Sequence, residues 1–168
     1  MLRNKISLVK SCACLLLIVF LSSGCSLFGL WEEPGADSKQ LWTYIQKRKP
    51  YIEYPFIPGE NGLYKGQDPH GYWLQTFVNA TALESLEDKK GMFPPGSLIV
   101  TENYSEEKEL RELTVMYKVE GYNPKAGDWY WVTYDVNGEP LHEGRAKVCI
   151  NCHSEMVDND YVFSGKIK

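Results

Sequence analysis

The stretch "ELTVMYKVEGY", residues 112–122, alternates between apolar and polar side chains. Successive side chains of a β-strand point to opposite faces of a sheet, so this period of two predicts a strand. The side chains expected on one face are Leu113, Val115, Tyr117 and Val119. Those expected on the other face are Thr114, Met116 and Lys118.

Further strands are expected on both sides of this one. "DWYWVTYDV" (128–136) follows it, and "YWLQTFVN" (72–79) and "SLIVTENY" (97–104) precede it. Asn137-Gly138, which comes directly after the last of these runs, is a strong signal for a tight turn. Because short loops connect the runs, we expect an antiparallel sheet.

Two helices are expected beside the sheet. The first covers residues 38–49 and is stopped by Pro50. The second covers residues 79–91, with Asn79 as its cap and Gly91 at its end. The predicted fold class is therefore α+β, mainly an antiparallel β-sheet with flanking helices.

The N-terminus has the plan of a secretory signal. Three basic residues precede an apolar run of about ten residues, which is too short to span a bilayer as a helix. The run is followed by Gly24-Cys25-Ser26, which resembles the lipobox of bacterial lipoproteins, whose cysteine carries a lipid anchor after cleavage. Ordinary cleavage after Gly24, which would leave a soluble protein, is the alternative.

These signals predict a signal peptide in residues 1–24, a tether in 25–37 and one domain in 38–168. We expect the protein in the bacterial periplasm or cell envelope, anchored to a membrane by a lipid on Cys25. The mature chain of 144 residues would carry 15 Lys and Arg against 22 Asp and Glu, a net charge of −7. A chain this acidic is not expected to bind nucleic acid.

Cys149, Cys152 and His153, in "AKVCINCHSE" (146–155), have the spacing of c-type haem attachment. Two thiols in this order add to the two vinyl groups of the porphyrin, and the adjacent histidine is then placed to coordinate the iron. The export signal agrees, because haem is attached to such proteins after export. We therefore expect one covalent haem c, with His153 as the iron ligand.

Two other roles of the cysteine pair stay open at this point. A structural zinc site would usually need four ligands, so His70 or His142 would have to join, since the chain has no second CxxC pair. A redox-active disulfide usually lies at the start of a helix after a strand in a βαβ pattern, which this half of the sequence lacks. The spacing together with the export signal favours haem over both.

The group on the other side of the iron decides what the haem can do. Met156 follows His153 too closely to reach that side. The candidates that remain are His70, His142, Met92 and Met116. None of the four stands out in the sequence, so an open iron is as compatible with it as a closed one.

Four blocks of the chain together resemble the cytochrome P-460 family, which includes the beta-sheet cytochromes c-prime. They read "FPPGSLIVTENY", "LTVMYKVEGYNPKAGDWYW", "CINCHSE" and "NDYVF", within residues 71–163. The resemblance implies a small, mainly antiparallel-sheet domain, commonly dimeric, with one C-terminal haem c. It makes Cys149 and Cys152 the attachment sites and His153 the proximal ligand, and it leaves the distal side of the iron open.

The resemblance also implies two kinds of chemistry. Some members oxidise hydroxylamine with a haem cross-linked to a lysine, and others bind nitric oxide or similar small ligands. The cross-linking lysine belongs to the block that reads Val100-Thr101-Glu102 here, and a threonine hydroxyl offers the porphyrin no amine. Of the other lysines, Lys118 lies nearest to this position in the family motif. We expect its side chain to have a structural role or to lie at the edge of the pocket. Thr101 is thus expected to lie next to the haem without being cross-linked to it.

The function expected from the sequence is that of an exported mono-haem c protein with a His-ligated, open iron. The iron would bind a small ligand such as nitric oxide or hydroxylamine, with redox chemistry on it. A six-coordinate mono-haem cytochrome c that transfers electrons is the alternative. The expected partners are the small ligand or a redox partner protein, a membrane through Cys25, and a second copy of the chain. The sequence identifies no catalytic residue, and enzymatic oxidation of hydroxylamine would need the amine that Thr101 lacks.

Overall fold

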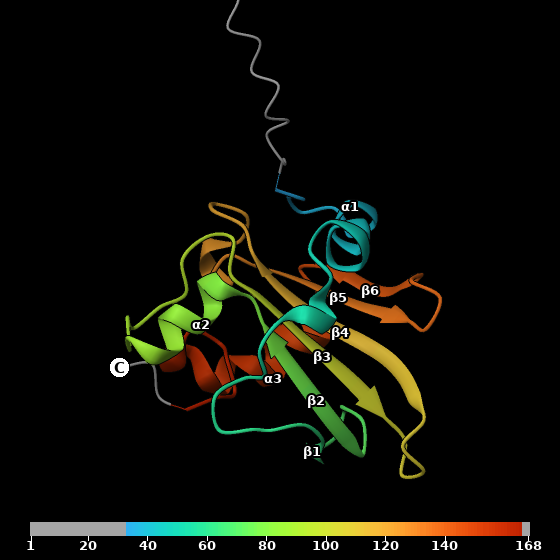
Figure 1. Cartoon of the computed structure of the whole chain (residues 1–168). Coiled ribbons are helices and arrows are strands. Elements are labelled where there is room, and N and C mark those ends of the chain that lie inside the picture. The colour runs from blue at the N-terminus through green and yellow to red at the C-terminus, as the bar shows by residue number, and fades with distance from the viewer. Residues whose placement is uncertain (1–32, 166–168) are drawn as a thin grey trace, which may run out of the picture. The chain divides into compact units, whose positions relative to one another are not determined.

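The computed structural model describes residues 33–165 (Figure 1). Within this range six strands form one antiparallel sheet, in which each strand pairs with the next one along the chain. The strands are β1 Tyr64–Lys65, β2 Trp73–Val78, β3 Leu98–Tyr104, β4 Leu110–Lys118, β5 Trp129–Asp135 and β6 Pro140–Gly144. Strands are thus present at the four expected places, although β4 ends at Lys118 rather than Tyr122, and the predicted α+β class is confirmed.

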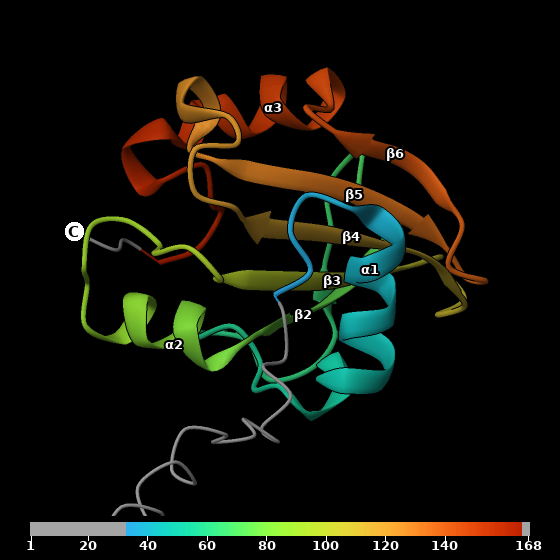
Figure 2. The same cartoon turned by 90° about the horizontal axis from the view of Figure 1, so that it is seen from above.

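Helices flank this sheet on both sides, as Figures 1 and 2 show. The α-helices of the described range are α1 Ser38–Thr43, α2 Ala80–Glu87 and α3 Lys147–His153. A wider π-type turn, Tyr44–Arg48, continues α1. Short 3-10 turns occupy Tyr51–Glu53, Pro124–Ala126 and Ser154–Asn159. Asn79 caps α2 as predicted, because its side chain accepts a hydrogen bond from the backbone N–H of Ala82.

One face of the sheet packs against α1 and the turns that follow it. Leu113, Val115 and Tyr117 of β4 point to this face, as the alternation of the sequence predicts. From α1 and its continuation, Leu41 and Ile45 are completely buried against them. This first core is rich in tyrosine, so its phenol groups need polar partners inside it.

The other face packs against α2, α3 and the C-terminal segment. Met116 of β4 and Trp129 and Trp131 of β5 point to this face. Phe93 and Val162 close over them, and Trp129 is completely buried. This second core occupies only part of the face, and the remainder of the face carries the cavity described below.

The structure differs from the sequence prediction at several places. The helix expected at 38–49 is α-helical only to Thr43, and the helix expected at 79–91 already ends at Glu87. Lys89 adopts a left-handed backbone with φ 51°, which cannot continue a helix. Strand β6 and helix α3 were not predicted: α3 buries no residue fully, and β6 contains a proline and ends in a glycine.

The segments expected as signal peptide and tether, including Cys25, lie mostly outside the described residues. In residues 33–165, no helix is long and apolar enough to cross a membrane.

Candidate functional site

Helix α3 carries Cys149, Cys152 and His153 on one of its faces. Residues three and four positions apart are neighbours on a helix surface, so the CxxCH spacing brings the three side chains together. Cys149 is half-buried, Cys152 is exposed, and both thiols are free. Burial raises the pKa of the Cys149 thiol, so this sulfur is held mainly as the neutral thiol.

The His153 imidazole is fixed in one orientation and one tautomer. Its Nδ1 lies 2.7 Å from the backbone oxygen of Tyr161. A carbonyl oxygen only accepts hydrogen bonds, so Nδ1 carries the proton and Nε2 keeps its lone pair. Trp131 and Phe163 contact the ring edge-on, with centroids 4.6 Å and 5.1 Å away. Burial lowers the pKa of His153, which also favours the neutral ring that a metal requires.

Tyr161 can offer its carbonyl because Asp160 ties the C-terminal segment to the sheet. The Lys118 ammonium bonds both carboxylate oxygens of Asp160, at 2.7 Å and 2.6 Å. The indole N–H of Trp129 donates to the Asp160 backbone oxygen at 2.8 Å. Lys118 is therefore engaged in a structural ion pair, as the sequence suggested, and it is not among the residues that line the cavity.

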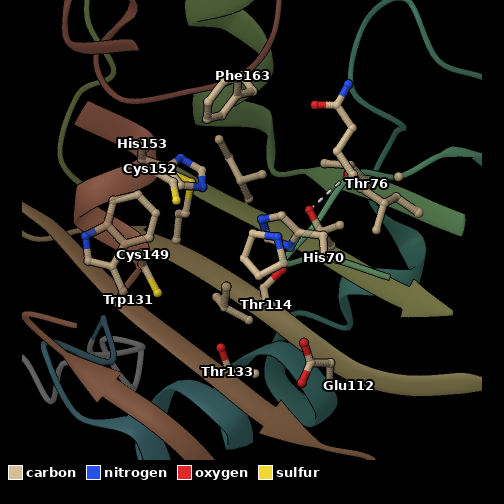
Figure 3. Close-up of a pocket in the computed structure, with 18 of the residues that line it drawn as sticks. His70, Thr76, Glu112, Thr114, Trp131, Thr133, Cys149, Cys152, His153 and Phe163 are labelled. Atoms are coloured by element: carbon tan, nitrogen blue, oxygen red, sulfur yellow. Dashed lines mark hydrogen bonds between the residues drawn. The ribbon is translucent and has the colours of Figure 1, made fainter. Parts of the chain in front are cut away.

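A cavity of about 590 Å³ lies between α3, the sheet and the loop before β2 (Figure 3). Cys149, Cys152 and His153 all line it. Its size falls within the range of small-molecule and cofactor sites in proteins. The three residues singled out by the sequence therefore lie together at the wall of one cavity.

A row of threonines forms the floor of this cavity. Cross-strand pairing places Thr76, Thr101, Thr114 and Thr133 side by side on β2, β3, β4 and β5. All four line the cavity, and His142 of β6 continues the row. The Thr76 and Thr101 hydroxyls are hydrogen-bonded at 2.9 Å, and the Tyr64 hydroxyl reaches Thr76 at 2.7 Å. Thr101, which the family resemblance places at the cofactor, thus lines this cavity.

The four candidate distal residues differ clearly in the structure. Met92 is 64 % exposed and does not line the cavity, and Met116 lines it from within the second core. His142 lines it from β6 with an exposed side chain. The His70 ring lies opposite His153, with centroids 6.2 Å apart. In Figure 3 the two imidazoles lie across the cavity from each other, and their ring planes are 80° apart.

Asn103 holds His70 in this position. Its side-chain oxygen lies 3.1 Å from Nδ1 of His70 and accepts the backbone N–H of Gly71 at 3.1 Å. Its Nδ2 donates to the backbone oxygen of Thr101 at 3.0 Å and to the Thr114 hydroxyl at 3.2 Å. Sequence reasoning could not find this contact, because His70 and Asn103 are 33 positions apart and no motif links them.

This arrangement gives little support to the two competing roles of the cysteine pair, a zinc site and a redox-active disulfide. Among residues 33–165 there is no cluster of three or more His, Cys, Asp or Glu side chains arranged to hold a metal ion directly. The two thiols are three positions apart on one turn of α3 and unbonded. A zinc site would thus need ligands that the described residues do not bring together.

Two thiols and an imidazole with a free Nε2, at the wall of a cofactor-sized cavity, are the donor set of a haem protein. The residues present fit that group. Residues 63–164 match the family model of Cytochrome P460, so the chain belongs to the cytochrome P460 family. Haem binding follows from this membership. Comparison with curated proteins gives no match.

Proposed function

We propose that the protein is an exported mono-haem c protein whose iron binds a small ligand such as nitric oxide. Cys149 and Cys152 would form the thioether bonds, and His153 would be the proximal ligand through Nε2. The observation that carries this proposal is the hydrogen bond from Nδ1 of His153 to the Tyr161 oxygen. Ligating histidines usually donate their other ring N–H to such an acceptor, which fixes the tautomer and makes the ligand more basic.

Haem supplies an iron that binds and exchanges electrons with diatomic ligands, and the protein sets access and polarity around it. The threonine row gives the cavity floor hydroxyls that can donate to a polar ligand, or to the edge of the porphyrin. Isoleucine, leucine and phenylalanine side chains supply the apolar part of the wall: Ile57, Leu74, Ile99 and Phe163. Such a lining suits a flat apolar cofactor with one polar region beside it.

Electron transfer is the second candidate, because His70 stands opposite His153. A haem closed on both sides by imidazoles exchanges electrons with a partner protein without binding a ligand. Hydroxylamine oxidation has less support, since Thr101 has no amine and Lys118 is bound to Asp160. We further propose lipid anchoring at Cys25, a location in the cell envelope and association of two copies, all of which rest on the sequence alone.

The first test concerns attachment. The full chain is expressed together with haem-attachment machinery, denatured and examined for haem that stays on the polypeptide. We expect covalent haem in the wild type and none stably retained in Cys149→Ala. Ser154→Ala is the matched control, because Ser154 is exposed at the end of the same helix and bonds only within it. Full covalent haem in Cys149→Ala would contradict the assignment.

The second test concerns the ligand. Nitric oxide is added to the reduced, haem-loaded protein, and its absorption spectrum is recorded. A saturable change of the spectrum is expected for a ligand-binding protein. A haem-loaded protein whose spectrum nitric oxide does not alter would instead favour the electron carrier.

A further inference from the structure

We propose that His70 is the sixth ligand of the iron in the resting protein, and that an incoming small ligand binds by displacing it. The inference rests on the haem assignment of the proposed function and adds a regulating residue to that site. Three observations carry it: the separation of the two imidazoles, the proton position on His70, and the way the loop of His70 is held.

The separation of the rings suits one metal atom between them. A metal–imidazole nitrogen bond is about 2.0 Å long and the ring centre lies about 1.1 Å beyond that nitrogen, so imidazoles on opposite sides of one metal ion have centres roughly 6 Å apart. The centroids of His70 and His153 are 6.2 Å apart. A distal histidine that only hydrogen-bonds an iron-bound ligand would have to lie roughly 3 Å farther from His153, because the ligand would stand between the iron and the distal ring.

The Asn103 side chain fixes where the proton on His70 lies. Its Nδ2 faces the Thr101 and Glu112 backbone oxygens, which can only accept, and the Thr114 hydroxyl, which accepts here. Its Oδ1 faces the Gly71 N–H, which only donates, so the amide cannot be turned around. Nδ1 of His70 must then donate to Oδ1, and Nε2 carries the lone pair.

His70 and His153 therefore have the same arrangement. Each ring donates Nδ1–H to a fixed oxygen inside the protein, and no hydrogen bond between described residues occupies either Nε2. A neutral His70 in this tautomer cannot donate from Nε2 to a bound ligand, but it can coordinate a metal. Asn103 is 1 % exposed, so the acceptor that orients His70 is itself immobilised in the sheet.

The loop of His70 lies close against the sheet and carries no covalent attachment site. Gly71 packs on β3, where an added Cβ would lie 2.6 Å and 2.7 Å from the backbone nitrogen and oxygen of Tyr104. The His70 backbone N–H donates to Gln67 in the same loop. His153, in contrast, sits on a helix next to both attachment cysteines. When a small ligand competes for the iron, His70 is therefore the ligand that dissociates.

The test compares spectra of haem-loaded variants of the full chain. We expect low-spin, six-coordinate iron in the wild type by absorption and electron paramagnetic resonance. His70→Gly should become high-spin and five-coordinate, and added imidazole should restore the low-spin spectrum. Met92→Ala is the control, since Met92 is exposed outside the cavity, and it should match the wild type. Each variant's covalent haem content is measured alongside.

Ligand binding gives an independent readout. If His70 occupies the iron in nine-tenths of molecules, its removal should raise the apparent affinity for nitric oxide about tenfold. A high-spin wild type overturns the role of His70, as does a low-spin spectrum lost in His142→Ala and kept in His70→Gly. Both results leave the proposed function standing. A low-spin wild type that needs His70, but in which nitric oxide changes neither spectrum, keeps His70 as a ligand and overturns ligand binding and displacement.

Discussion

The Lys118 ammonium and the Asp160 carboxylate form a two-pronged ion pair between β4 and the segment that follows α3. Both residues are buried, at 7 % and 9 % exposure. Asp160 Oδ2 also accepts the backbone N–H of Phe93 at 2.8 Å, so the carboxylate is bonded on several sides. Burial nevertheless lowers the pKa of Lys118, because losing water around the ammonium outweighs the attraction of Asp160.

We expect Lys118→Met to lower the free energy of unfolding in urea by about 3–5 kcal/mol, because it leaves Asp160 buried without a counter-charge. The double variant Lys118→Met/Asp160→Asn should recover part of this loss, since no charge remains buried. Lys90→Met is the control, because Lys90 pairs with Glu84 on the surface, and it should change stability little. Equal effects of Lys118→Met and Lys90→Met would contradict the structural role of the buried pair.

Gly71→Ala should disturb His70 without affecting haem attachment. The new methyl group meets the backbone of Tyr104, which cannot move without breaking the pairing of β2 with β3, so the loop must shift. The haem-loaded variant should show more high-spin iron than the wild type, at an unchanged covalent haem content. Gly165→Ala is the control, because nothing lies within 4 Å of its added Cβ. An unaltered spin state in Gly71→Ala would show that the loop does not need this close approach.

Thr101→Lys should place an amine at the cavity floor, between Thr76 and Thr114. With an oxidant supplied, since a new C–N bond removes two hydrogens, we expect a cross-link from this lysine to the haem. Mass spectrometry of the digested protein would then find the residue-101 peptide joined through haem to the α3 peptide. Thr133→Lys, two strands away on the same floor, is the comparison. If neither the residue-101 peptide nor the residue-133 peptide is joined to haem, the pocket of this protein differs from that of the cross-linked family members at more than one side chain.

Alkaline pH should destabilise the fold through its buried tyrosines. Burial, aided by Glu143, raises the pKa of Tyr130 to about 12, and burial also raises the pKa of Tyr51, whose hydroxyl donates to Glu102 at 2.7 Å. A tyrosine with a raised pKa keeps its proton longer in the folded chain than in the unfolded one. Its contribution to stability is therefore complete below the ordinary pKa of 10.0 and is lost as pH rises through the folded pKa.

The measurement is the urea midpoint as a function of pH above and below 10.0. Tyr51→Phe should reduce the slope of stability against pH, whereas Tyr72→Phe, at an exposed position, should leave it unchanged. A midpoint that stays constant through this range would contradict the prediction.

The strands were predictable because their signal is local. Leu113, Val115 and Tyr117 alternate with Thr114 and Met116 in the sequence, and each group faces its own side of the sheet. The three residues proposed to hold the haem were recognisable for the same reason, since five consecutive positions contain them all. Asn79 was found as a cap because helix caps are read from neighbouring residues.

The remainder of the site depends on distant pairings that no short pattern contains. The threonine row exists only because the register of four strands brings Thr76, Thr101, Thr114 and Thr133 into line. His70 stands out from His142, Met92 and Met116 only after the loop has folded onto Asn103. Strand β6 was not predicted, because it is short, lies at the sheet edge and contains Pro140 and Gly144, which are uncommon in strands. Helix α3 was not predicted, because none of its residues is fully buried.

The shallow docking of α3 bears on the order in which the protein matures. The sheet and its two cores are assembled from residues before and after α3, while Cys152 remains open to solvent. If haem is attached at Cys149 and Cys152 as proposed, the protein could fold first and receive its cofactor afterwards, with Cys152 still accessible to an attaching enzyme. On the proposed assignment, haem bound beside this helix would then be the last part of the interior to be put in place.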